Sequence, residues 1–361
     1  MEFDPIFHPA GAAKLTTRPW ISVDMIIDVH AHFTPNLLFE RFDANAPRFP
    51  GVALLRDGKG KRLAFCGGEP TRPIAPKLSD LADRRAWMDE NGIDHQLIGG
   101  WLDSFGYELP ASEGLAWSRY LNDCMWEALR QEPRFTALAT VPLQDGKLAA
   151  EVLGEALERG FGGVMIGTLT KGASGVLDDP ALDPFWEAAS KLGAAIYLHP
   201  MFICGEPRIA DYDLVNAIGR LADTSIAVAR LLFSGHLLKY RGMKFVLSHG
   251  GAALPYALGR LARSFAIHPG KYSDPRKSFE AMYFDSIVFD ADALKFLVDK
   301  AGAGRVMLGS DMPFPIGDPA PKKILEEGSY FTQEQRQSIL GDNAEKIFRL
   351  RADAAPGKGG D

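Results

Sequence analysis

Short apolar segments alternate with longer amphipathic segments through most of this chain. The short segments are rich in β-branched residues and end in small or polar residues, which is typical of buried parallel strands. The longer segments repeat apolar residues at helical spacing, as in Lys147–Arg159 and Pro184–Lys191. The strands predicted from this pattern are Met25–Val29, Gln96–Trp101, Thr136–Val141, Gly163–Thr168, Ala194–Leu198, Lys244–Ser248, Met282–Ser286 and Arg305–Gly309.

Alternation of eight strands with helices predicts parallel strands joined by crossover helices. The α/β fold that closes eight such units is the (β/α)8 TIM barrel. The alternation is interrupted over residues 33–79, where Pro and Gly are frequent and two short apolar runs flank the sequence DGKG at residues 57–60. This pattern predicts a small β-hairpin insertion after the first strand, lying over the mouth of the barrel.

The barrel is predicted to span residues 25–350. Residues 1–24 contain acidic residues and no continuous apolar stretch, so they are interpreted as an N-terminal extension rather than a secretory signal. Residues 351–361 are small and polar and are expected to form a flexible tail. The sequence has no run of 18 or more apolar residues, which argues against a membrane partner.

Composition narrows the classes of protein that fit this chain. Of 361 residues, 46% are hydrophobic and 24% are charged, and the net charge is −6, so nucleic-acid binding is not expected. Cys66, Cys124 and Cys204 are odd in number and far apart, which excludes a disulfide scaffold and predicts a cytoplasmic protein. Cys66 and Cys204 are both expected to pack in apolar surroundings, and the alternative for each is an approach to the substrate pocket.

Five side chains suited to metal binding or proton transfer follow four of the predicted strands. His30 and His32 follow the first strand and, being two residues apart, face the same side of it. His199, His249 and Asp311 follow the fifth, sixth and eighth strands. A single buried histidine is often structural, but five such residues at the catalytic end of a barrel favour a metal-dependent active site.

This constellation resembles the amidohydrolase superfamily, in which histidines follow strands 1, 5 and 6 and an aspartate follows strand 8. The segments IDVHAH, PRFTALATVPLQ, GFGGVMIGT, HGGAALPYALGR, YFDSIVFD and GSDMPFPIGD extend the likeness from about residue 26 to residue 350. In order and spacing they are similar to the family of aminocarboxymuconate semialdehyde decarboxylase and related metal-dependent decarboxylases. Lys171 lies beyond the fourth strand, so the bridging lysine of binuclear members is not expected, and one metal ion per chain is predicted.

The resemblance implies a divalent metal, zinc or alternatively manganese, held by His30, His32, His199 and Asp311. It also implies that His249 activates a metal-bound water and that Asp311 can transfer a proton. The implied activity is non-oxidative decarboxylation of a small conjugated or aromatic carboxylic acid by metal-bound hydroxide, a carbon–carbon lyase reaction. The alternative is a metal-dependent hydrolase or hydratase acting on an aromatic ring-cleavage product or an amide. A non-catalytic metal-binding protein is disfavoured.

The resemblance further implies arginine clamps for a small carboxylate substrate. Arg62 in the hairpin is one of them. Arg260 is the other and is supplied in the family by the neighbouring subunit, which predicts a homodimer. Both arginines are otherwise interpreted as solvated surface charges. Phe314 is expected to line the substrate pocket or to serve in packing, and Met201 stands where the family has a tryptophan, which leaves the substrate open.

Two further residues lie at the ends of predicted strands. Asp285 ends the seventh strand and is expected either to orient a ligand histidine through its second nitrogen or to cap the following loop. His95 starts the second strand, at the bottom of the barrel, where a structural role is expected.

Overall fold

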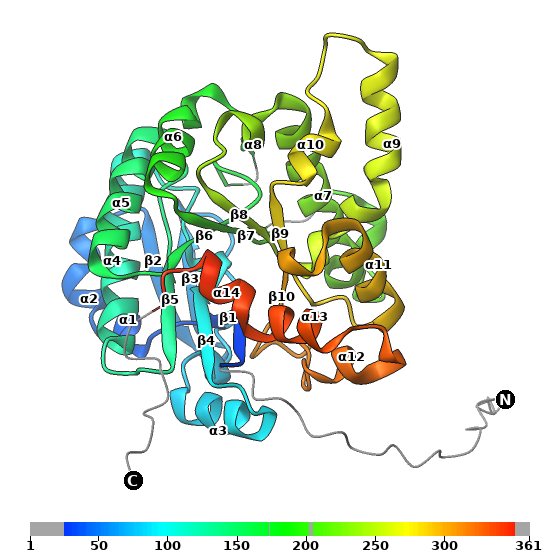
Figure 1. Cartoon of the computed structure of the whole chain (residues 1–361). Helices are drawn as coiled ribbons and strands as arrows, with labels where there is room; N and C mark the ends of the chain where they lie inside the picture. Colours follow the sequence, from blue (N-terminus) through cyan, green and yellow to red (C-terminus); the bar gives the residue numbers. More distant parts are fainter. Residues whose placement is uncertain (1–24, 173, 202–204, 351–361) are drawn as a thin grey trace, which may run out of the picture.

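The computed structural model describes residues 25–172, 174–201 and 205–350 (Figure 1). The predicted N-terminal extension at residues 1–24, the predicted tail at residues 351–361 and Cys204 lie outside the described residues. Within the described part of the chain, no helix is both long enough and apolar enough to cross a membrane.

Eight parallel strands form one sheet in which each strand pairs with the next along the chain, so the predicted (β/α)8 barrel is confirmed. Val29 N donates to Leu308 O (2.9 Å) and His32 N donates to Met312 O (2.8 Å), which joins the first strand to the last and closes the sheet. The strands are β1 (Ile27–Phe33), β4 (His95–Gly100), β5 (Phe135–Ala139), β6 (Gly163–Ile166), β7 (Ala195–Leu198), β8 (Lys244–Leu247), β9 (Met282–Asp285) and β10 (Val306–Met307).

The first strand is longer than the sequence predicted. β1 continues through HAHF to Phe33, so His30 and His32 lie inside the strand rather than after it. A shift of register between Asp28 and Ala31 marks an irregularity in the pairing of β1 with β4. Polar residues after an apolar run predicted that the strand ends before His30. The strand continues because the ring nitrogens of His30 and His32 have hydrogen-bond partners inside the barrel.

Helices cover the outside of the barrel (Figure 1). Both predicted helices form, each with slightly wider bounds. In one of them, Asp145 accepts hydrogen bonds from the first backbone N–H groups and Gly160 ends the helix at φ 102°. The helices are α3 (Leu81–Asn91), α4 (Ala111–Leu129), α5 (Gly146–Arg159), α6 (Asp183–Leu192), α7 (Arg220–Ser234), α8 (His236–Lys239), α9 (Leu254–Ile267), α10 (Pro275–Phe279), α11 (Ala291–Ala301), α12 (Lys323–Glu326), α13 (Gln333–Gln337) and α14 (Asn343–Ile347).

The predicted hairpin follows β1. Strands β2 (Val52–Asp57) and β3 (Gly60–Phe65) pair antiparallel across the DGKG turn, after short helices α1 (Asn36–Glu40) and α2 (Phe42–Asn45). Aromatic residues of this segment pack against Trp117 of α4 in a second buried cluster. Cys66 is exposed at a turn with φ 52°, so its expected apolar packing is wrong.

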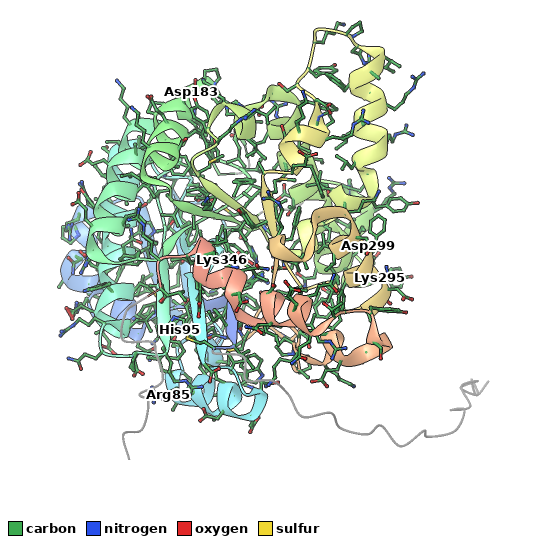
Figure 2. The ribbon with its side chains drawn as sticks, viewed as in Figure 1. Arg85, His95, Asp183, Lys295, Asp299 and Lys346 are labelled. Atoms are coloured by element: carbon green, nitrogen blue, oxygen red, sulfur yellow. The ribbon has the colours of Figure 1, made fainter. Side chains whose placement is uncertain are left out.

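His95 lies at the first residue of β4, where Figure 2 labels it near the lower edge of the barrel. It is fully buried, and its Nε2 lies 2.8 Å from the Thr136 hydroxyl of the next strand. This contact links two strands at the end of the barrel remote from the predicted site, as a structural histidine would.

Candidate metal centre

Four histidines and Asp311 converge at the carboxyl ends of β1, β7, β8 and β10. One ligand atom each of His30, His199, His249 and Asp311 lies within 4.8 Å of the others. His32 belongs to the same group, because its Nε2 lies 3.1 Å from His30 Nε2 and 3.2 Å from Asp311 Oδ1. The structure therefore brings together all five residues that the sequence predicted as ligands or proton-transfer groups.

Three of the histidines are fixed by contacts to the ring nitrogen that faces away from the cluster. Each of these contacts has an acceptor oxygen, so the proton stays on Nδ1 and the Nε2 lone pair points into the cluster. The contacts are His30 Nδ1 to Asp285 Oδ2 (2.7 Å), His32 Nδ1 to Gly100 O (3.0 Å) and His199 Nδ1 to Pro200 O (2.8 Å).

The atoms that face one another in the cluster cannot hydrogen bond among themselves. His30 and His32 direct lone pairs at each other across 3.1 Å. Asp311 Oδ1 is buried and has no hydrogen-bond partner among the described residues. Lone pairs that meet in this way need a cation between them, and imidazole nitrogens with one carboxylate are a donor set for a divalent metal. The residues present therefore fit a metal ion.

Asp285 takes both roles considered for it, because it contacts His30 and also accepts from the Ile287 N–H (3.1 Å) of the following loop. Burial acts to raise the pKa of Asp285. The hydrogen bond and the electrostatic interaction with His30 act in the opposite direction and outweigh burial, so the pKa of Asp285 is lowered. The carboxylate also accepts from the Tyr197 hydroxyl (2.8 Å) and the Gly250 N–H (2.9 Å). These contacts hold the charged form of Asp285 in place, and Asp285 in turn orients His30.

His249 is more exposed than the other histidines of the cluster, and its pKa shifts in the opposite direction to that of His199. Burial lowers the pKa of His199 well below that of a free histidine, and the neighbouring histidines lower it further. Burial also acts to lower the pKa of His249, but the contact with Asp311 and the charge of that carboxylate outweigh it and raise that pKa. His249 Nε2 lies 3.6 Å from Asp311 Oδ2, and the residue is partly exposed at φ 54°. It is the histidine best placed to exchange protons with the cavity.

A buried polar network beneath the cluster connects β1 with β4, α3 and the segment after β10. Asp28 accepts from Gln96 Nε2 (2.7 Å) and from the Ser310 hydroxyl (2.5 Å). Arg84 donates to Gln96 Oε1 (2.8 Å) and to the carbonyl of His32. Burial raises the pKa of Asp28 to about 6 and lowers that of Arg84 to about 10. This network ties β1, which presents His30 and His32, to Ser310, the residue before Asp311.

A cavity of about 770 Å³ opens above the cluster. His32, His199, His249 and Asp311 form part of its lining, and Phe314 lines it as predicted, with its ring 5.0 Å from that of His32. A volume of this size accommodates a small organic acid.

The other substrate-binding candidates do not line this cavity. Arg62 pairs with Asp57 across the hairpin, and its side chain is only 15% exposed. Arg260 is exposed on α9. Met201 is buried beneath the cavity, with its N–H directed at the Thr168 hydroxyl (3.3 Å).

Two cavity arginines were missed from the sequence. Arg72 lies in the segment after β3 and pairs with Asp103 (3.1 Å), and Arg220 is the first residue of α7. Neither stands next to a recognisable motif. The only available signal for Arg220 was its place on the helix that follows the His199 strand.

A closed (β/α)8 barrel with this donor set at the carboxyl ends of its strands defines the class of metal-dependent barrel enzymes. The amidohydrolase family model matches residues 27–350. The chain is 30% identical to 2-amino-3-carboxymuconate-6-semialdehyde decarboxylase of Dictyostelium discoideum over 334 residues, 90% of this chain and 91% of that protein. The chain belongs to the amidohydrolase family.

Solved structures agree with this assignment. The crystal structure of 5-carboxyvanillate decarboxylase from Sphingomonas paucimobilis has a TM-score of 0.74 and 26% identity, covering 91% of this chain and 100% of that chain. Dihydroxybenzoic acid decarboxylase from Polaromonas sp. JS666, solved with bound manganese, shares the fold with a TM-score of 0.72 and 24% identity, covering 92% of this chain and 99% of that chain. Its relatives place the chain among the decarboxylases of the family.

Proposed function

We propose that this enzyme catalyses the metal-dependent, non-oxidative decarboxylation of a small aromatic or conjugated carboxylic acid. The observation that carries the proposal is the convergence of three Nε2 lone pairs and Asp311 at the floor of a cavity that also contains arginines. A hydrolase or hydratase would use the same ligands. The two cavity arginines favour an acidic substrate, and the decarboxylase relatives favour loss of a carboxylate.

His30, His32, His199 and Asp311 would hold one divalent metal ion. We assign zinc as the native metal, with manganese as the alternative because a structural neighbour binds it. When bound, the metal supplies Lewis acidity, which polarises oxygen ligands and lowers the pKa of water. Asp285 and the carbonyls of Gly100 and Pro200 hold the proton of each of the three histidines on Nδ1, which leaves Nε2 free to bind the metal.

His249 is assigned the proton transfers. It lies beside Asp311 and opens to the cavity, so as a base it takes a proton from the water that adds to the substrate. As an acid it returns that proton to the neighbouring carbon that carries the carboxylate. When the bond to the departing carbon dioxide breaks, its electron pair re-forms the carbon–carbon double bond and the added hydroxide leaves. Asp311 stabilises the protonated imidazole through its charge and shares in these proton transfers.

Substrate contacts are assigned to Arg72, Arg220 and Phe314 of the same chain. Arg260 is assigned to the neighbouring site of a homodimer. This is supported by its exposure on α9, a helix that projects from the edge of the barrel in Figure 1. A clamp role for Arg62 stays a prediction, because its guanidinium contacts Asp57 instead. We also propose a cytoplasmic location, on the three widely spaced cysteines.

The test is a screen of hydroxybenzoates, carboxylated hydroxybenzoates and carboxylated muconate semialdehydes with zinc- or manganese-loaded protein. Release of carbon dioxide and the matching decarboxylated product is the expected result. A hydrolysed or hydrated product that retains every carboxylate would show that the alternative reaction is the right one.

A further inference from the structure

Arg220 is a cation of the cavity that the metal cluster does not use. It follows a π-helical turn, Val215–Gly219, and lies half-buried in the cavity wall. Its Nε donates to Asn216 Oδ1 (3.0 Å), and its Nη1 makes a long contact with Met201 O (3.5 Å). Among the described residues, no carboxylate pairs with its guanidinium. A half-buried guanidinium with such partners retains donors for a ligand.

The other cavity arginine already has a carboxylate partner. Arg72 donates to Asp103 through Nε (3.1 Å) and lies over the ring of Trp101. Asp213 also lines the cavity, but it is exposed and accepts from Asn216 Nδ2 (2.9 Å) rather than from Arg220. Burial lowers the pKa of Arg220, and the like charge of Arg72 is the next strongest cause. The opposite charge of an anion bound at this place would offset both effects.

Arg220 belongs to the wall of the cavity rather than to its catalytic floor. Arg220 lines the same cavity as Arg72 and Asp103, and it makes no hydrogen bond to a residue of the metal cluster among the described residues. Asp223 lies one turn further along α7 and accepts a hydrogen bond from the hydroxyl of Thr168, which follows β6. This bond holds the first turns of α7, and with them Arg220, against the barrel. Arg220 thus faces the cavity that Arg72 and Asp103 also line, while the departing carboxylate must lie near His249.

We infer that Arg220 binds a second acidic substituent of the substrate, so that the preferred substrates are aromatic or conjugated dicarboxylic acids. This inference rests on the proposed function, because the departing carboxylate lies at the metal cluster only if the enzyme is a metal-dependent decarboxylase. Arg220 is then a specificity-determining residue whose bidentate donors match a carboxylate.

The test compares three ligands that share one ring: 2-hydroxybenzoate, its 5-carboxylated derivative and the uncharged 5-carboxamide. Binding to zinc-loaded protein is measured by titration calorimetry. The solution in the calorimeter is then analysed by chromatography to detect turnover. Arg220→Met removes the charge and keeps an unbranched side chain. Arg230→Met is the matched control, because Arg230 lies on the same helix, pairs with Asp178 and does not line the cavity.

Wild-type protein is expected to bind the dicarboxylate more tightly than the other two ligands. Arg220→Met should weaken dicarboxylate binding about 10- to 100-fold and change 2-hydroxybenzoate and carboxamide binding by less than about 3-fold. Equal weakening of all three ligands, or no weakening of any, overturns the inference. Because binding is measured without requiring turnover, absence of carbon dioxide release from every acid would refute the proposed reaction separately.

Discussion

His249 and the three histidines fixed through Nδ1 differ in what their ring nitrogens contact. Substitution of His249 should therefore affect turnover rather than metal content. His249→Ala removes the proton carrier and leaves His30, His32, His199 and Asp311 in place. We expect about one metal ion per chain to remain and turnover to fall by about 10²- to 10⁴-fold. Metal analysis and a carbon dioxide assay measure the two effects. His268→Ala, outside the cavity, is the control, and a fully active His249→Ala variant would refute the assignment.

Asp285 allows a second test at the scale of one residue. Asp285→Asn keeps the size of the side chain but weakens the acceptor that fixes the proton on His30 Nδ1. Metal affinity should fall about 10- to 100-fold, as is typical for partners of metal ligands. Competition with a chelator measures this. Tyr197→Phe removes a different contact of the same carboxylate, and an equal loss in both variants would contradict a specific effect on His30.

Among elements, α3 is tied to the barrel by one buried arginine. Arg84→Met leaves Gln96 Oε1 and the carbonyl of His32 without their donor. The free energy of unfolding should fall by about 3 kcal/mol or more, because buried polar partners lose a charged donor. Arg85→Met is the matched control. Arg85, labelled in Figure 2, pairs with Glu132 at a partly exposed site, so its loss should cost about 1 kcal/mol or less. Equal losses in urea unfolding would contradict the role of Arg84.

The same elements show what the sequence could and could not predict. Strand–helix alternation identified all eight barrel strands, and the five cluster residues were found because strand ends of a barrel meet at one face. The arginines were harder to place. Arg72 and Arg220 reach the cavity through a loop and through the rotation of a helix, neither of which has a periodic signal. Arg62 has the residue type expected of a clamp, but a local contact with Asp57 occupies it.

The metal site joins segments from both ends of the described chain, so metal binding should stabilise the whole molecule. His30 and Asp311 meet although 281 positions separate them in the sequence. At a free metal concentration about 100-fold above Kd, binding contributes about 2.7 kcal/mol to the folded state. A chelator should therefore lower Tm and abolish turnover, and added zinc should restore both. Two bound ions per chain, or an unchanged Tm after complete metal removal, would contradict the single structural and catalytic metal.

At the scale of the assembly, the exposed position of Arg260 predicts that active sites are shared between two chains. We expect His249→Ala and Arg260→Ala proteins to be inactive separately. In a mixed dimer, the chain that carries Arg260→Ala keeps its own His249 and receives an intact Arg260 from the other chain. One site in such a dimer is then complete.

Random exchange makes half of the dimers mixed, so the mixture should recover about a quarter of wild-type activity. Subunit exchange is verified with a mass-tagged chain, and the carbon dioxide assay measures recovery. Because an arginine acting within its own chain would restore no complete site, an inactive mixture after verified exchange would place the function of Arg260 outside the neighbouring active site.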